Sequence, residues 1–254
     1  MAVVPNPKYQ DTVIHDCIPQ SGKCWMECNQ CFFNRPGAYY TETPSIPTVE
    51  EVGDGIVRMN GGHDSNLEKD LVIKTAKQYK DVFFNTSIPS FDFPGPVVFT
   101  ANRKEEERPV MPGDNAGYNG GIWREGYWAR PEFKNLMFIR LRVSATNLGW
   151  IKNAVKEWTG CLGNVPVVLT FMAYYDHEPT ITPDIPINPC YEWRVRHLNS
   201  YWCPTKEFMR CVMDIFKDNR LVSLCGSIQD GPWCKGCRNC ETYYLQAKKR
   251  LKGE

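Results

Sequence analysis

Short apolar segments alternate with helical patterns along this chain, and this alternation limits its fold more than any other feature. The strand-like segments are residues 12–17, 55–60, 81–87, 96–102, 136–144, 165–175 and 221–225. Strands that alternate with helices predict βαβ units, in which neighbouring strands run parallel. About five or six such units are too few to close an eight-stranded barrel. The expected fold class is therefore α/β, in the form of a partial, open (β/α)6-type barrel.

Two helical patterns and one irregular stretch set the predicted organisation. One apolar stripe consists of Leu148, Ile151, Val155 and Trp158, and a second consists of Phe208, Cys211, Val212, Ile215 and Phe216. Residues 88–135 are rich in Pro, Gly and charge, which favours an insertion or a long loop. We expect a barrel domain over 1–220, with this insertion at about 88–135. Residues 221–254 are expected to form a cysteine-rich segment.

The overall charge and hydropathy exclude several classes of protein. The chain has 254 residues, and 30 basic against 29 acidic residues give no global field for attracting nucleic acid or an anionic membrane. No apolar run reaches the roughly 18 residues of a membrane span. The N-terminal segment lacks the apolar core of a secretory signal, so we expect a cytoplasmic protein without a membrane partner. In that compartment, 12 cysteines point to metal binding or redox chemistry instead of disulfides.

Three cysteines lie within one short segment of the N-terminal region. Cys24, Cys28 and Cys31 follow a C-x3-C-x2-C spacing. Thiolates are soft ligands that select zinc or iron–sulfur clusters. Three ligands on a 4Fe–4S cluster leave one iron free of protein, so such a site can be catalytic. A zinc knuckle, with His15 or Cys17 as a fourth ligand, remains an alternative interpretation.

This spacing resembles the signature of the radical S-adenosylmethionine superfamily. The resemblance implies that Cys24, Cys28 and Cys31 are catalytic and hold a 4Fe–4S cluster. In that family the open iron binds the methionine moiety of S-adenosylmethionine. Reductive cleavage then yields a 5′-deoxyadenosyl radical, which takes a hydrogen atom from the substrate. The resemblance also implies a small electron donor of the flavodoxin or ferredoxin type.

Further positions resemble the cofactor-binding residues of the same superfamily. The Gly61-Gly62-His63 run after the second predicted strand is similar to the family's Gly-Gly-Glu motif, although His replaces Glu. Polar residues at later strand ends correspond to family positions near the ribose or the carboxylate. The residues expected to bind the cofactor are Gly61, Gly62, His63, Asn85, Arg142, Ser144 and, for the adenine, Phe32. Arg140 lies on the same strand face as Arg142 and Ser144.

A second group of cysteines lies near the end of the sequence. Cys225, Cys234, Cys237 and Cys240 include a C-x2-C-x2-C spacing, which occurs in ferredoxin-type clusters. We expect these four residues to bind a second 4Fe–4S cluster, of the auxiliary kind that many radical S-adenosylmethionine enzymes carry. Structural zinc is the alternative. Cys203 is a spare candidate ligand.

The sequence says less about the substrate. Residues 117–133 interleave aromatic side chains with arginines, a mixture that stacks on bases or caps a barrel mouth. Small enzymes similar to this one modify nucleotides, DNA bases or peptides. We expect a nucleotide or a modified DNA base. A peptide-modifying enzyme and a non-catalytic zinc-binding interaction module are the alternatives.

Overall fold

The structure of the chain is a computed structural model, and the statements below concern the residues that it describes. These are residues 12–26, 28, 30–31, 44–104, 107–111, 135–160, 164–174, 187–195, 200–231 and 234–253. No helix in these ranges has both the length and the apolar character needed to cross a membrane.

The architecture is α/β, as the alternation of strands and helices predicts. A parallel sheet has seven strands in the order β1-β2-β3-β4-β5-β6-β9. Their bounds are β1 Ile14–Cys17, β2 Ile56–Met59, β3 Val82–Thr86, β4 Val97–Thr100, β5 Leu136–Val143, β6 Val167–Phe171 and β9 Val222–Leu224. Each of the first six strands therefore pairs with its neighbour in the sequence. A separate antiparallel hairpin joins β7 (Tyr191–Arg194) to β8 (Tyr201–Pro204).

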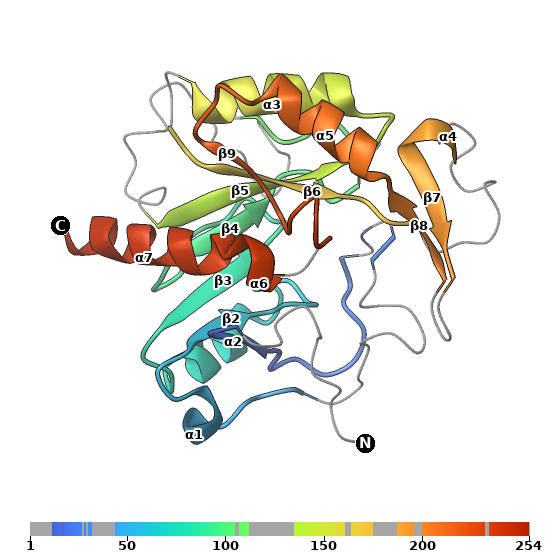
Figure 1. The fold of residues 1–254 in the computed structure, drawn as a ribbon. Coiled ribbons are helices and arrows are strands. Elements are labelled where there is room, and N and C mark those ends of the chain that lie inside the picture. Colours follow the sequence, from blue (N-terminus) through green and yellow to red (C-terminus); the bar gives the residue numbers. More distant parts are fainter. Residues whose placement is uncertain are drawn as a thin grey trace.

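Helices cover both faces of the sheet, and α7 covers one of them (Figure 1). The opposite face packs against α1 (Val49–Val52), α2 (Lys69–Ala76), α3 (Leu148–Thr159) and α5 (Lys206–Ile215). The helix α7 runs over Asn239–Lys252, and α4 (Ile187–Cys190) and α6 (Cys234–Cys237) are single turns. Side chains of a strand alternate between the two faces, so each strand contributes to two separate cores.

The two predicted helical stripes have different outcomes. Ile151, Val155 and Trp158 of α3 are buried against the sheet, as expected. The stripe predicted for α5 is partly wrong, because Cys211 is exposed and Ile215 is 45% exposed. Met209 is buried instead. The buried side of α5 therefore consists of Phe208, Met209, Val212 and Phe216, and the ring of Phe208 lies against Phe171 and Tyr191.

We call the surface of the sheet beneath α7 the α7 face. Its apolar layer consists of Ile14, Ile56, Phe83, Val98, Met137, Phe138 and Val168, which pack with Tyr244 and Ala247 of α7. Polar contacts anchor the helix at the amino ends of β3 and β5. The Tyr244 hydroxyl donates to Asp81 Oδ1 at 2.8 Å, Lys248 forms an ion pair with the same carboxylate, and Arg250 donates to the Leu136 carbonyl.

The anchor at Asp81 gives a prediction about pH. Burial raises the pKa of Asp81, but hydrogen bonds from Lys248 and Tyr244 outweigh burial and hold that pKa below its usual range. Because the pKa of Asp81 is lower in the folded state, its ionised form stabilises the fold. This stabilisation is complete above about pH 3.9, the ordinary aspartate value, and it is lost as the pH falls through the folded-state pKa. We expect Asp81→Asn to lower the free energy of unfolding by about 1–2 kcal/mol near neutral pH.

Urea unfolding at neutral and at acidic pH measures this effect. The difference between wild type and Asp81→Asn should narrow as the pH falls below the usual aspartate range. The matched control is Asp54→Asn, because the Asp54 side chain is fully exposed in its contact with Lys80. If the loss of unfolding free energy in Asp81→Asn does not depend on pH, the pKa of Asp81 is not lowered by its contacts with α7.

Candidate functional site

Most of the predicted cofactor residues follow strands of the parallel sheet or lie near their carboxyl ends. The segment with Cys24, Cys28 and Cys31 follows β1, and Gly61–His63 follow β2 directly. Asn85 lies near the end of β3, and Arg142 near the end of β5. In parallel α/β sheets, the carboxyl ends of the strands form the edge where ligands bind. The topology therefore brings these segments to one edge of the sheet.

The three thiols of the first cysteine segment are free and influence one another. Burial, together with the neighbouring Cys31 and Cys24, raises the pKa of Cys28 to about 12, although the charges of Arg142 and Arg103 oppose the rise. A thiol with this pKa is protonated near neutral pH. A bound metal would displace the proton and stabilise the thiolate.

Backbone groups from two segments point at the sulfur of Cys24. Burial raises the pKa of Cys24, and hydrogen bonds from the backbone N–H groups of Met26 and Asp64 oppose this shift. Backbone donors to cysteine sulfur are among the features that set the potential of iron–sulfur clusters. The segment after β2 is thus in direct contact with the first cysteine.

Asp64 connects three segments at this edge. Its buried carboxylate accepts hydrogen bonds from Ser87 N at 2.6 Å, Ser87 Oγ at 2.9 Å, Thr86 Oγ1 at 2.8 Å and Asn66 N at 2.9 Å. Its carbonyl accepts from Gln20 Nε2 at 3.3 Å. Burial raises the pKa of Asp64, and these donors oppose the rise. The carboxylate therefore ties the end of β3 to the segment after β2, and the backbone of Asp64 reaches the cysteine segment.

The Gly-Gly-His run has close contacts with its own chain. A Cβ atom on Gly61 would lie 2.4 Å from Asp16 Oδ1 and 2.5 Å from Arg58 Nη2, so a larger residue at this position would displace these two side chains. Asp16 and Arg58 form an ion pair with Arg58 Nε 2.7 Å from Asp16 Oδ1. His63 is hydrogen-bonded to the backbone of Gly22, and burial lowers the pKa of this imidazole.

The predicted residues of β3 and β5 serve mainly to connect strands. Asn85 Nδ2 donates to the Met59 carbonyl at 3.1 Å, which braces β3 against β2. Arg142 Nε lies 3.0 Å from Met172 Sδ, and its guanidinium also donates to the Arg103 carbonyl. The Ser144 Oγ lies 3.0 Å from Thr146 Oγ1. Arg142 therefore contributes positive charge beside Cys28, whereas Ser144 shapes the turn into α3.

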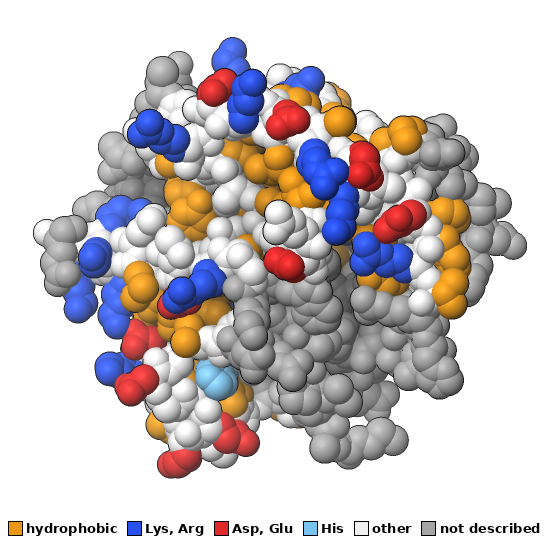
Figure 2. Space-filling view, viewed as in Figure 1, with side chains coloured by type: hydrophobic (Ala, Val, Ile, Leu, Met, Phe, Trp, Pro, Cys, Tyr) orange, Lys and Arg blue, Asp and Glu red, His pale blue; other side chains and the backbone are white. Residues whose placement is uncertain are grey.

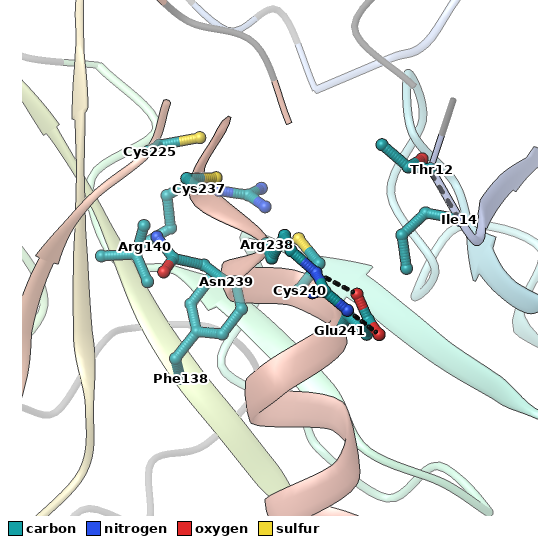
Figure 3. A pocket seen from close by; sticks show the side chains of 11 residues that line it. Thr12, Ile14, Phe138, Arg140, Cys225, Cys237, Arg238, Asn239, Cys240 and Glu241 are labelled. Carbon is teal, nitrogen blue, oxygen red and sulfur yellow. Dashed lines mark hydrogen bonds and ion pairs between the residues drawn. The ribbon is translucent and has the colours of Figure 1, made fainter. Parts of the chain in front are cut away.

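The second cysteine group borders a pocket on the α7 face (Figure 3). Cys225, Cys237 and Cys240 line this pocket together with Phe138 and Arg140 of β5. Cys234 is the first residue of α6, and its side chain lies outside the described part of the structure. Phe32, the predicted adenine contact, also lies outside the described residues. In the described ranges, no three His, Cys, Asp or Glu side chains gather at one point as they would around a single metal ion.

Comparison of the chain with known protein families, curated proteins and solved structures finds no match.

Three residues at this edge were not predicted as site residues. Asp64 and Gln20 join the cysteine segment to the segment after β2, as described above. The Asn102 amide exchanges hydrogen bonds of 2.7 Å with the backbone of Arg142, which joins β4 to β5. The sequence contained a weak indication of Asp64, because this residue directly follows the Gly-Gly-His run. It contained none of Gln20 or Asn102.

Proposed function

We propose that this protein is a radical S-adenosylmethionine enzyme whose catalytic 4Fe–4S cluster is held by Cys24, Cys28 and Cys31. The observation that carries the proposal is the setting of these thiols. They are free, they follow β1 of a parallel sheet, and backbone N–H groups from two segments point at Cys24. A soft three-sulfur donor set fits a cluster that keeps one iron open.

The arrangement of the sheet supports a partial, open (β/α)6-type barrel. Six strands lie side by side in sequence order, and all of their pairings are parallel. That order is the one expected of a barrel built from successive βα units. On this proposal, the α7 face is the interior of the barrel.

Each group of residues has its own role in this proposal. When bound, the cluster supplies an electron that cleaves the sulfonium of S-adenosylmethionine, and a flavodoxin- or ferredoxin-type protein provides that electron. The backbone of Gly61–His63 would bind the methionine moiety of S-adenosylmethionine. Arg142 offsets the negative charge of the thiolates, because its guanidinium already stabilises the ionised form of Cys28. Asp64 holds the loops in place.

A nucleotide or a modified DNA base is the proposed substrate. Arg58 of β2 and the two arginines of β5, Arg140 and Arg142, lie on the same side of the sheet. Asp16 of β1 forms an ion pair with Arg58. This excess of positive charge suits a substrate that carries phosphate. Hydrogen abstraction from the nucleotide is the proposed reaction.

Anaerobic reconstitution tests the proposed function. The purified chain is supplied with iron and sulfide, then with S-adenosylmethionine and dithionite, and 5′-deoxyadenosine is measured by chromatography. We expect a brown protein that releases 5′-deoxyadenosine even without substrate. A reconstituted protein that binds iron and sulfide but releases no 5′-deoxyadenosine under reducing conditions would overturn the proposal.

A further inference from the structure

A layer of polar side chains follows the apolar layer of the α7 face. Its members each lie two residues beyond an apolar residue of that layer, and they are Asp16 of β1, Arg58 of β2, Asn85 of β3 and Arg140 of β5. Because side chains alternate along a strand, all four point to the α7 face. The polar layer therefore lies towards the carboxyl edge of the sheet, where the catalytic cluster is proposed.

The two cations of the polar layer have different partners. Arg58 is 7% exposed, and its Nε lies 2.7 Å from Asp16 Oδ1 in an ion pair. Among the described residues, the half-buried Arg140 donates only to a neutral group, with Nη1 3.5 Å from Asn85 Oδ1. Burial raises the pKa of Asp16 and the charge of Arg140 opposes this rise, so Arg140 lies near the ion pair. One carboxylate thus serves two guanidinium groups.

Neighbouring groups hold the Arg140 side chain in position. Asn85 Nδ2 donates to the Met59 carbonyl at 3.1 Å, which directs the amide oxygen of Asn85 towards Arg140. The guanidinium carbon of Arg140 also lies 5.7 Å from the centroid of the Phe138 ring. In the described part of the chain, Nε and Nη2 of Arg140 have no hydrogen-bond partner. The side chain is therefore oriented by its neighbours and keeps two donors for a ligand.

Arg140 lines the pocket beside the second cysteine group (Figure 3). We call it the C-terminal thiol pocket, because its lining includes Cys225, Cys237 and Cys240. Two other charged residues of the lining, Arg238 and Glu241, pair with each other at 2.9 and 2.7 Å and add no net charge. Arg140 thus gives the lining one positive charge that no carboxylate of the lining balances. A partly buried cation without a paired anion is costly, and this cost favours the binding of an anion.

We propose that Arg140 binds the terminal phosphate of a mononucleotide substrate beside the C-terminal thiol pocket. The Nε and Nη2 donors lie on one edge of the guanidinium group and can hold two phosphate oxygens at once. The inference rests on the proposed function, because that function makes the bound mononucleotide a substrate. Binding itself requires neither the cluster nor S-adenosylmethionine.

The depth of Arg140 favours a mononucleotide over DNA. Arg142 is two residues closer to the end of β5, about 7 Å along the strand, and its charge opposes the raised pKa of Cys28. In the other direction along β5, Phe138 belongs to the apolar layer beneath α7. A nucleotide chain cannot continue past Arg140 into this packed layer, whereas a monophosphate ends there. The sugar and base then extend from Arg140 towards the first cysteine segment.

Isothermal titration of the purified full chain tests the proposal. The probes are the 5′-monophosphates of adenosine, guanosine, cytidine and thymidine, the matching nucleosides, and a single-stranded oligonucleotide without terminal phosphates. At least one monophosphate should bind about 10–100-fold more tightly than its nucleoside, because hydrogen bonds to a charged group contribute the corresponding free energy. If no monophosphate binds more tightly than its nucleoside, or if the oligonucleotide binds more tightly than every monophosphate, the proposal is wrong.

Substitutions of Arg140 separate phosphate binding from a structural role. Arg140→Gln should lower the affinity for the monophosphate to that for the nucleoside and leave the nucleoside affinity unchanged. Arg140→Lys should recover part of the loss, because Lys keeps the charge without the two-donor edge. The matched control is Arg210→Gln, since Arg210 is exposed on α5 and pairs with Glu207. Circular dichroism checks that each variant is folded.

Two results of these variants contradict the proposal. One is an unchanged monophosphate affinity in Arg140→Gln, and the other is a loss of S-adenosylmethionine binding in place of monophosphate binding. The 5′-deoxyadenosine assay keeps this proposal apart from the proposed function. Release of 5′-deoxyadenosine without monophosphate binding at Arg140 rejects the phosphate site alone, whereas binding without release rejects the radical chemistry alone.

Discussion

Replacing Cys28 by Ala should reduce the release of 5′-deoxyadenosine by more than about 100-fold. Even the loss of a residue that only hydrogen-bonds to a metal ligand lowers metal affinity or activity by about 10–100-fold, and here the proposed ligand itself is lost. Cys28 is the central thiol of the first cysteine segment and is electrostatically coupled to both of the others. Without it, two thiols cannot hold a cluster with three protein ligands. The iron content should therefore fall by about four atoms per chain.

The measurement combines iron analysis with the 5′-deoxyadenosine assay on the reconstituted protein. Cys211→Ala is the control, because Cys211 is exposed on α5 and is remote from the cysteine segment in the sequence. The control should match the wild type in both quantities. If Cys28→Ala still releases 5′-deoxyadenosine at the wild-type rate, Cys28 does not hold the catalytic cluster.

Asp64→Asn should lower the free energy of unfolding by about 3 kcal/mol, because buried donors that lose their acceptor cost about 1–3 kcal/mol each. Asn has nearly the same shape as Asp, but its NH2 group cannot accept a hydrogen bond. The carboxylate of Asp64 accepts from both the backbone and the hydroxyl of Ser87 at a single oxygen, Oδ2. One amide orientation leaves these two Ser87 donors without an acceptor, and the other leaves the backbone N–H of Asn66 without one and removes the acceptor at Asp64 from the Thr86 hydroxyl.

The same substitution should also weaken iron binding at the proposed site of Cys24, since the backbone N–H of Asp64 donates to Cys24. Urea unfolding measures the stability, and iron analysis measures the occupancy. Asp70→Asn is the matched control, because Asp70 is exposed in the first turn of α2. Equal stabilities of Asp64→Asn and Asp70→Asn would show that the carboxylate of Asp64 does not join these segments.

The sheet could be predicted from the sequence because its strands are buried on both faces. Each predicted strand segment contains one strand of the sheet, including the short β4 within the irregular region and β9 at the end. Parallel strands covered on both faces appear as continuous apolar runs, which stand out in a sequence. The positions of the candidate site residues at strand ends follow from the same pattern.

The helix α7 and its contacts were harder to predict. Tyr244 and Ala247 are its buried residues, Leu245 and Leu251 are exposed, and the helix is strongly basic towards its end. Figure 2 shows Lys and Arg side chains gathered near the outer end of this helix. Two apolar positions are too few to form a recognisable stripe. The burial of Asp64 could not be predicted from the sequence either, because a hydrogen-bond network between distant segments produces no periodic pattern of residues.

The position of α7 also has a consequence for assembly. The α7 face of the sheet is built mainly from β1 to β6, but the helix that covers it comes from the end of the described chain. Cys240 lies on this helix and Cys237 lies just before it, whereas Arg140, which lines the same pocket, lies on β5. When α7 packs on the sheet, it covers the apolar layer of the α7 face and completes the C-terminal thiol pocket in the same step. Any substitution that loosens α7 from the sheet must disturb both together.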